Sequence, residues 1–278
     1  DTLAALLTRG ADFYRGTHLL VDVGTNGEVV LAHDGKLTAT SCATGPVYEG
    51  AHIRCGVRAA PGALERVWVE PGGKIRWAAI PDDGERGDRR PIGLCGSGVI
   101  SCVAAGVGAG LIGTDGALAP PQAHRQLRAN PSGRSGELVL VEAPFSRTGR
   151  DIVLTQQDVR AVQLGKSALR CGIEILLAQS GVTKVDRIYL AGTFGNHLDP
   201  VDILSIGLVP PVPVEHVRSI GNAAGDGARM ALFNRHHRSR AVSLARRLDV
   251  LELSGRADFQ ELFVTHTGLT PMAENPFA

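Results

Sequence analysis

Short apolar runs separated by polar turns mark the first part of the chain. His18 to Val23, Glu28 to His33 and Leu37 to Ser41 are apolar runs, and the turns Gly24 to Gly27 and Asp34-Gly35 lie between them. Runs of this length with turn residues between them are typical of consecutive antiparallel strands. The pattern therefore predicts a three-stranded β-meander.

Apolar positions at helical spacing predict one long helix in the second half of the chain. The spacing holds from Val159 to Gly181, and the string Thr155-Gln-Gln-Asp158 before it has the form of a capping box. Shorter helices are predicted over 1–10, 97–111, 224–233 and 238–247. Further strands are predicted over 66–69, 74–80, 138–141, 187–191, 217–220 and 250–253. This succession of strands and helices indicates an α/β fold.

The regular pattern is lost in the middle of the chain. From Pro120 to Gly149, the sequence is rich in Pro, Ser, Gly, Gln and Arg, and only the strand at 138–141 is predicted there. Such a segment is typical of a surface insertion or of a seam between two lobes. We therefore divide the chain into a first part at 1–119, the insertion or seam at 120–150, and a helix-rich part at 151–278.

Glycine is far more frequent here than in an average protein. There are 35 glycines in 278 residues, whereas about 7% is usual. Many of them gather in four turns that each follow a predicted strand or open a predicted helix: Gly24-Thr-Asn-Gly27, Gly93-Leu-Cys-Gly-Ser-Gly98, Gly192-Thr-Phe-Gly-Asn196 and Gly221-Asn-Ala-Ala-Gly-Asp-Gly227. Four such turns in one chain favour a ligand site more than any single turn would.

The first turn has the residues that a phosphate site needs. Its glycines allow backbone N–H groups to approach an anion closely, and Thr25 adds a hydroxyl. Asp22, at the end of the preceding strand, could hold a Mg²⁺ ion through water. The alternative is an ordinary hairpin in which Asn26 and Gly27 supply a positive φ.

The other turns suit different parts of a ligand. Gly192 and Gly195 follow a buried strand and leave room for a flat ring or a ribose, to which Asn196 could form a hydrogen bond. A plain strand-to-helix turn is the alternative there. Asn222 and Gly225 precede a helix whose N-terminal N–H groups favour an anion. The turn that contains Gly96, Ser97 and Gly98 also opens a helix.

Charge and cysteine content argue against several classes of protein. With 29 basic and 28 acidic residues, the net charge is +1, and no apolar run reaches the roughly 20 residues of a membrane-spanning helix. We therefore expect neither a nucleic-acid nor a membrane partner. Five cysteines without a C-x-x-C pair favour a reducing, cytoplasmic environment. The first residue is Asp1, and we expect the chain to be part of a longer protein.

Several strings together resemble a known family. They are DVGTNGEVVL (22–31), ATSCATGPVYEGAHIRCGVRA (39–59), GLCGSG (93–98), LTQQDVRAVQLGKSALRCGIEILL (154–177), YLAGTFGNHLDP (189–200) and IGNAAGDGAR (220–229). They are similar to the C-terminal region of the reductive activators of corrinoid proteins, which resemble the actin, hexokinase and Hsp70 ATPases. The resemblance implies an actin-like (ribonuclease H-like) α/β ATPase lobe with an additional small β-rich subdomain.

The resemblance also implies roles for the residues of the glycine turns. Asp22 and Thr25 would be catalytic, with Asp22 holding Mg²⁺ through water, and ATP would be the nucleotide. The second phosphate turn of such ATPases corresponds to Asp22, Gly24, Thr25 and Asn26, and Gly27 closes it. The adenosine turn corresponds to Gly192, Gly195 and Asn196. The helix-opening turn near the cleft corresponds to Gly96, Ser97 and Gly98.

The activity implied by the resemblance is ATP-driven reduction of a Co(II) corrinoid to Co(I) on a methyltransferase partner, by a protein that forms a homodimer. Members of the family resemble one another in having an N-terminal [2Fe–2S] ferredoxin domain. No C-x₄-C-x₂-C run occurs here, so we expect that cluster only in a region before Asp1.

Two alternatives remain open. The chain could be a dimerisation and docking module whose nucleotide site is vestigial. It could also be an activator ATPase similar to the dehydratase activators, in which Cys42 and Cys95 of two chains share an iron–sulfur cluster. Buried, inert thiols are the simpler interpretation of these two cysteines.

Overall fold

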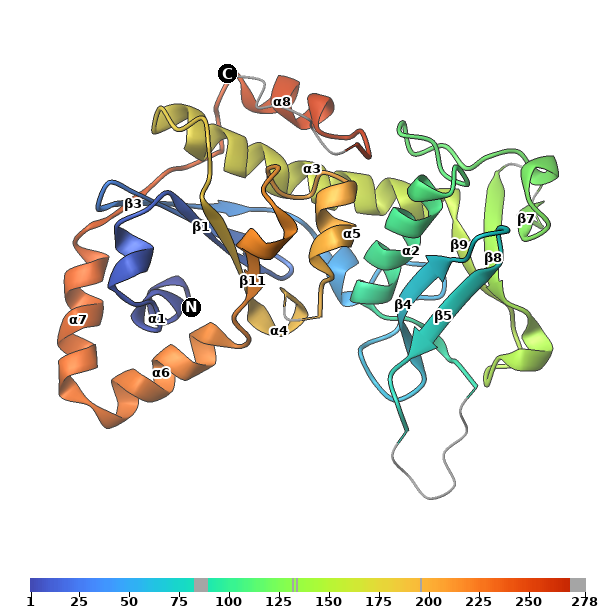
Figure 1. Cartoon of the computed structure of the whole chain (residues 1–278), viewed down its shortest axis with the longest axis horizontal. Coiled ribbons are helices and arrows are strands. Elements are labelled where there is room, and N and C mark those ends of the chain that lie inside the picture. The colour runs from blue at the N-terminus through green and yellow to red at the C-terminus, as the bar shows by residue number, and fades with distance from the viewer. Residues whose placement is uncertain (83–89, 132, 134, 196, 271–278) are drawn as a thin grey trace.

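The computed structural model describes residues 1–82, 90–131, 133, 135–195 and 197–270 (Figure 1). Its largest sheet has six strands in the order β11-β10-β1-β2-β3-β12. Their bounds are β1 His18–Val23, β2 Gly27–His33, β3 Lys36–Cys42, β10 Arg187–Ala191, β11 Val217–Ser219 and β12 Leu248–Val250. The strand β2 is antiparallel to both of its neighbours, and the other adjacent pairs are parallel.

The meander β1-β2-β3 is confirmed, and its second turn has the predicted chemistry. Asp34 and Gly35 have φ values of 48° and 76°. Two consecutive positive φ values are typical of the two-residue hairpin turn that Asp-Gly favours. The pairing of His33 with Lys36 closes this hairpin.

Both faces of this sheet are buried, because both sets of alternating side chains in β1 and β2 are apolar. Leu19, Val21 and Val29 belong to a core shared with the long helix α3 (Gln156–Gln179). Leu20 and Val30 belong to a second core, shared with the helices α1 (Thr2–Leu7), α6 (Ala223–Phe233) and α7 (Arg235–Ala245). Figure 1 shows α3 on one side of the sheet and the other three helices opposite. Helices on both faces explain the continuous apolar runs of the sequence.

A second, β-rich region lies beside the main sheet. It holds two three-stranded sheets, ordered β5-β4-β6 and β7-β8-β9, and the helix α2 (Gly96–Gly108) (Figure 1). The strand bounds are β4 Ala63–Val69, β5 Ile75–Ala79, β6 Gly93–Leu94, β7 Leu127–Ala129, β8 Gly136–Val141 and β9 Ile152–Thr155. The segment 120–149 thus contains two strands where one was predicted. The three-residue strand β7 is too short to show a periodic pattern.

The helix boundaries follow from capping contacts. The capping box of α3 is confirmed, because the Asp158 N–H donates to Thr155 Oγ1 (3.2 Å) and the Thr155 N–H donates to Asp158 Oδ2 (2.8 Å). The helix α7 starts earlier than predicted, because Asn234 Oδ1 caps its first turn. Among the described residues, three helices were not predicted: α4 (Gly192–Gly195), α5 (Pro200–Ser205) and α8 (Phe259–Thr265). In the described part of the chain, every helix is too short or too polar to cross a lipid bilayer.

Polar side chains buried on α3 hold the C-terminal segment. Lys166 Nζ donates to the carbonyl oxygens of His266 (2.7 Å) and Gly268, and Gln163 Nε2 donates to that of Thr267 (2.7 Å). The Ser167 hydroxyl donates to the carbonyl of Phe263 in α8. These α3 residues recur at helical spacing, so their side chains lie on one face of the helix. They donate to backbone carbonyl groups of the C-terminal segment that would otherwise lack donors.

The buried amine makes the stability of the fold depend on pH. Burial, with the nearby charge of Arg170, lowers the pKa of Lys166 to about 7. The amine loses its proton near pH 7 in the folded chain and only near the ordinary lysine pKa of 10.5 in the unfolded chain. The unfolded state therefore binds more protons between these values, and the Lys166 contribution to stability rises with pH.

We expect Lys166→Met to remove this dependence. From pH 7 to pH 9, the unfolding free energy of the natural chain should rise relative to that of the variant by about 2 to 3 kcal/mol. Urea unfolding of both proteins across this interval measures the difference. Parallel pH profiles would show that the amine keeps an unshifted pKa.

Candidate functional site

Three of the four glycine turns meet at one edge of the main sheet. Because β1, β10 and β11 are parallel, their carboxyl ends lie at the same edge, where ligands bind in open α/β sheets (Figure 1). Asp22 of β1 pairs with Ala191 of β10, and Gly192 follows directly. The Gly192 N–H donates to the carbonyl of Gly221 at 3.0 Å. The turns after β1, β10 and β11 are therefore in direct contact.

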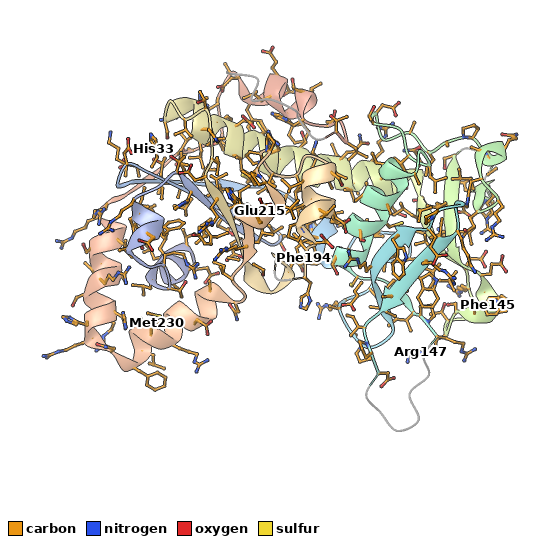
Figure 2. All side chains as sticks on the ribbon, in the orientation of Figure 1. His33, Phe145, Arg147, Phe194, Glu215 and Met230 are labelled. Carbon is orange, nitrogen blue, oxygen red and sulfur yellow. The ribbon has the colours of Figure 1, made fainter. Side chains whose placement is uncertain are left out.

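The fourth turn reaches this edge through an aromatic pair. The rings of Tyr48 and Phe194 are stacked, with centroids 5.5 Å apart and an interplanar angle of 22°. A Cβ atom on Gly96 would lie 2.6 Å from the Phe194 ring and 1.8 Å from the Tyr48 carbonyl oxygen. Figure 2 places Phe194 between the main sheet and the β-rich region. Glycine at position 96 lets the two regions approach closely here.

Side chains outside the first glycine turn form hydrogen bonds with it. The Thr44 hydroxyl lies 2.8 Å from the Gly24 carbonyl oxygen and 2.9 Å from that of Thr25, and it can donate to either. The Thr25 hydroxyl donates to Glu49 Oε1 in the 3₁₀ helix η2 (Pro46–Glu49). Thr25 and Asn26 are exposed, so their backbone and side chains are accessible to a ligand.

The hairpin alternative for this turn fails in one respect. Neither Asn26 nor Gly27 has a positive φ. Glycine is required at position 27 for a different reason: a Cβ atom there would lie 2.7 Å from Leu169 Cδ1 and 3.1 Å from Thr44 Cγ2. Close packing of the turn on α3, and not turn conformation, explains this glycine.

Two carboxylates face the same edge. Asp22 and Glu28 are directly opposite each other in the β1-β2 pairing, and both are partly buried. Burial raises the pKa of Asp22, and burial together with the Asp22 charge raises the pKa of Glu28. Neither forms an ion pair within the described residues. The positive charge of the Asp1 amino group offsets these shifts only in part, so a cation near Asp22 would relieve the remaining negative charge.

This pair fits a hydrated Mg²⁺ ion. Mg²⁺ usually keeps several waters and takes one or two protein carboxylates together with phosphate oxygens of a substrate. Across the described ranges, no three His, Cys, Asp or Glu side chains are grouped to hold a metal by themselves. The carboxylate Oδ1 of Asp22 also occupies the space beside Gly192, where a Cβ atom would lie only 2.3 Å from it.

Other predicted residues have clear structural roles. Asn222 Oδ1 accepts the Gly225 N–H at 2.9 Å and so caps α6, which uses one of the N–H groups expected to bind an anion. Gly98 packs α2 onto β4, because a Cβ atom would lie 2.0 Å from the Leu64 carbonyl oxygen. Ser97 is buried, with its hydroxyl 3.3 Å from Cys95 Sγ. Gly195 has no such restriction, and Asn196 lies outside the described residues.

A largely apolar cavity of about 290 Å³ adjoins the turns. Its lining residues come from both regions: Tyr48, Glu49, Arg58, Ala59, Glu65, Ile80, Cys95, Gly96, Ser97, Phe194 and His197. The sequence did not identify Glu28, Thr44, Tyr48, Glu49 or Phe194 as candidates. Strand pairing across the first turn places Glu28 opposite Asp22 and could have identified Glu28. The other four residues act through contacts that only the fold creates.

The buried state of two cysteines favours inert thiols. Cys42 and Cys95 are 1% and 2% exposed, respectively. Burial raises the pKa of Cys42 to about 12. Cluster ligands shared between two chains would need accessible thiolates.

The fold is the predicted actin-like, ribonuclease H-like α/β lobe with a small β-rich subdomain. A family model described as the C-terminal domain of RACo, the ASKHA domain, matches residues 16–278, and the chain belongs to this family.

Two curated relatives and one solved structure are similar to the chain. The corrinoid activation enzyme RamQ of Eubacterium limosum is 35% identical over 277 residues, which cover 96% of this chain and 45% of RamQ. The [Co(II) methylated amine-specific corrinoid protein] reductase of Methanosarcina barkeri is 26% identical, covering 89% of this chain and 45% of that protein. A reductive activator for corrinoid, iron–sulfur protein has a TM-score of 0.85 and 32% identity, covering 98% of this chain and 42% of its own. The chain thus spans less than half the length of these proteins.

Gly192 and Gly195 provide a matched test of the site's packing. Gly192 has a φ of +87° and lies against Asp22, whereas the nearest atom to a Cβ on Gly195 would be 3.6 Å away. We expect Gly192→Ala to lower the unfolding free energy by about 1 to 3 kcal/mol and Gly195→Ala by less than about 1 kcal/mol. Denaturant unfolding of both variants measures this. Equal losses would mean that Asp22 does not restrict position 192.

Proposed function

We propose that this chain binds Mg-ATP at the edge where its glycine turns meet. We further propose that ATP hydrolysis there drives the reduction of a Co(II) corrinoid to Co(I) on a methyltransferase partner. The observation that carries the proposal is the unpaired Asp22–Glu28 carboxylate pair beside an accessible glycine turn, in a member of the ASKHA family. The names of the relatives describe activation or reduction of corrinoid proteins and support the second part.

The phosphates would lie against the first turn. The backbone N–H groups of Thr25 and Asn26 and the Thr25 hydroxyl would donate to phosphate oxygens. The Thr25 hydroxyl now donates to Glu49, so a phosphate would compete for that donor. Asp22 would orient waters of the metal ion, which supplies charge neutralisation when it is bound.

The nucleoside would lie in the adjoining cavity. Its volume of about 290 Å³ and its apolar lining beside Phe194 suit a flat base. Because Tyr48 and Glu49 come from η2 and Phe194 from the segment after β10, a bound nucleotide would contact both regions. Its binding could therefore change how the regions close on each other, which is how nucleotides drive partner proteins in many ATPases.

Three further features belong to the proposal. Electrons would come from a [2Fe–2S] ferredoxin domain outside this chain. The complete protein would act as a homodimer, and it would work in the cytoplasm.

Calorimetric titration of Mg-ATP into this chain tests the binding step. We expect saturable heat, and we expect Asp22→Asn to weaken binding about 10- to 100-fold, because outer-shell partners of metal ions have effects of this size. Asp34→Asn is the matched control, since Asp34 is an exposed aspartate in the β2-β3 turn. Excess chelator should remove the difference between the natural chain and Asp22→Asn.

If the titration gives no heat, a second titration decides between two explanations. If a longer protein that includes the preceding region binds Mg-ATP, the site is shared with that region. If it also fails to bind, the nucleotide proposal is wrong and the docking-module alternative stands.

The reduction step is tested in the complete protein. We expect Asp22→Asn to slow ATP-dependent formation of Co(I) on a corrinoid protein about 10- to 100-fold, followed by its absorbance. Binding of the corrinoid protein should persist, because Asp22 acts on the nucleotide. A variant that reduces corrinoid at the natural rate would exclude a role for hydrolysis at this site.

A further inference from the structure

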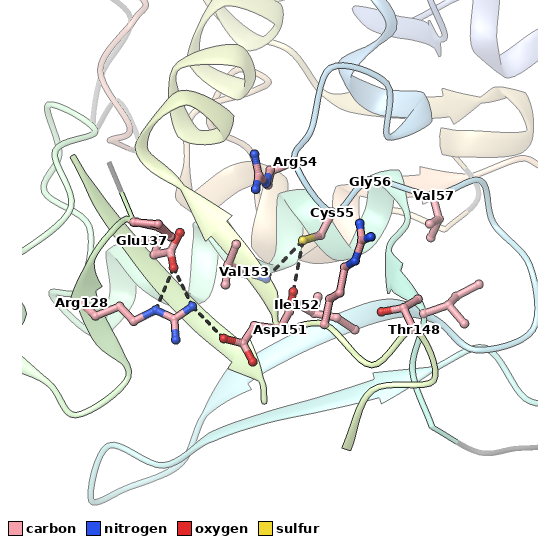
Figure 3. Close-up of a pocket in the computed structure, with 13 residues that line it drawn as sticks. Arg54, Cys55, Gly56, Val57, Arg128, Glu137, Thr148, Asp151, Ile152 and Val153 are labelled. Atoms are coloured by element: carbon pink, nitrogen blue, oxygen red, sulfur yellow. Dashed lines mark hydrogen bonds and ion pairs between the residues drawn. The ribbon is translucent and has the colours of Figure 1, made fainter. Parts of the chain in front are cut away.

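A second cavity lies in the β-rich region and is lined by three arginines. Its volume is about 680 Å³, and it opens between the loop at 54–57 and the strands β8 and β9 (Figure 3). It shares no lining residue with the cavity beside Phe194. The arginines are Arg54, Arg128 and Arg150.

One of the arginines is fully neutralised. Arg128 Nε donates to Glu137 Oε1 at 2.7 Å, and its terminal nitrogen lies 2.7 Å from both Glu137 Oε1 and Asp151 Oδ2 (Figure 3). Asp151 Oδ1 also accepts the Ala143 N–H at 2.7 Å. The Arg128 guanidinium lowers the pKa of Asp151, which keeps this carboxylate charged and bound to Arg128. Among the described lining residues, the two carboxylates thus both bind Arg128, and together they carry one negative charge more than it neutralises.

The other two arginines are not ion-paired, although the Asp158 carboxylate lies near Arg54 and accepts its backbone N–H at 2.8 Å. The guanidinium groups of Arg54 and Arg150 form no ion pair or hydrogen bond with any described residue. Cys55, which also lines the cavity, adds no negative charge, because burial raises the pKa of its thiol. The three arginines and two carboxylates of the described lining give it a net charge of +1, and neither Arg54 nor Arg150 is ion-paired within it.

We propose that this cavity binds a small anionic molecule through Arg54 and Arg150. A guanidinium group offers a planar fork of donors that matches phosphate and carboxylate oxygens, and two of them on one cavity can hold a single oxyanion. The Thr148 hydroxyl lies on the same lining. Val57, Ile92 and Val153 give an apolar surface for the carbon part of an organic anion. The volume falls within the range of ligand pockets.

The cavity continues past Arg54. A neighbouring hollow of about 440 Å³ shares Arg54, Pro131 and Glu137 with it. That hollow is also lined by the Asp158 carboxylate, which disfavours an anion there, so the anionic groups of a ligand belong in the larger cavity. This site is independent of the proposed nucleotide site, because none of its residues belongs to the glycine turns.

Titration of inorganic phosphate, pyrophosphate and citrate into this chain tests the proposal, at constant ionic strength set with chloride. We expect saturable binding of at least one of these probes. Arg54→Ala and Arg150→Ala should each weaken it about tenfold or more, and the double variant should abolish it. Arg246→Ala is the matched control, because Arg246, at the C-cap of α7, is an exposed arginine whose side chain has no partner among the described residues. Neither cavity variant should lower the melting temperature in chloride alone, since both side chains are exposed and unpaired.

The choice of probes also distinguishes a phosphate ligand from a carboxylate ligand. Stronger binding of pyrophosphate than of citrate would identify a phosphate ligand, and the reverse would identify a carboxylate ligand. Binding that survives the double variant but is lost in Thr25→Ala would place the ion at the glycine turns and overturn the proposal. Absence of binding by all three probes would overturn it as well.

Discussion

The parallel pairing of β1 with β10 is the constraint on which the site depends. It places Asp22 opposite Ala191, so that Gly192, the residue after Ala191, lies against the Asp22 carboxylate. No side chain fits there, and the backbone at Gly192 takes a positive φ that carries the chain away from the sheet. The same residue donates to Gly221, which brings the turn after β11 into the same place. One register therefore positions three turns that are far apart in the sequence.

A sheet buried on both faces gives this edge its rigidity. Alternate residues of β1 and β2 pack into two separate cores, and a shift of one residue would exchange all of them. The apolar faces alone would tolerate such a shift, because both are apolar. The contacts at the strand ends would not tolerate this shift, because Gly27 packs against Leu169 of α3 and the Thr44 hydroxyl holds the turn that precedes Gly27. Polar and steric contacts at the ends thus select one register among those that hydrophobic burial allows.

Features that depend on neighbours in the sequence were predictable, and those that depend on distant contacts were not. The meander, its Asp34-Gly35 turn and the capping box at Thr155 are local, and all three are confirmed. The four glycine turns lie at strand ends or helix starts, as predicted, although Gly27 and Gly98 are glycine because of packing on other elements. Thr44 and Glu49 carry no local signal, because their partners lie about 20 residues away. The helix α8 binds to polar side chains of α3 and has a weak pattern of its own.

The charges at the glycine edge also decide which form of nucleotide could bind. ATP phosphates and the Asp22–Glu28 pair are all negative, so their direct approach would be repulsive in a partly buried site. A hydrated divalent cation between them converts this repulsion into attraction, because each group then faces positive charge. Burial raises the pKa values of both carboxylates and so disfavours their ionised forms, and a cation would reverse that preference. On the proposed function, metal and nucleotide therefore bind cooperatively, and neither the turn nor the carboxylate pair forms a complete site alone.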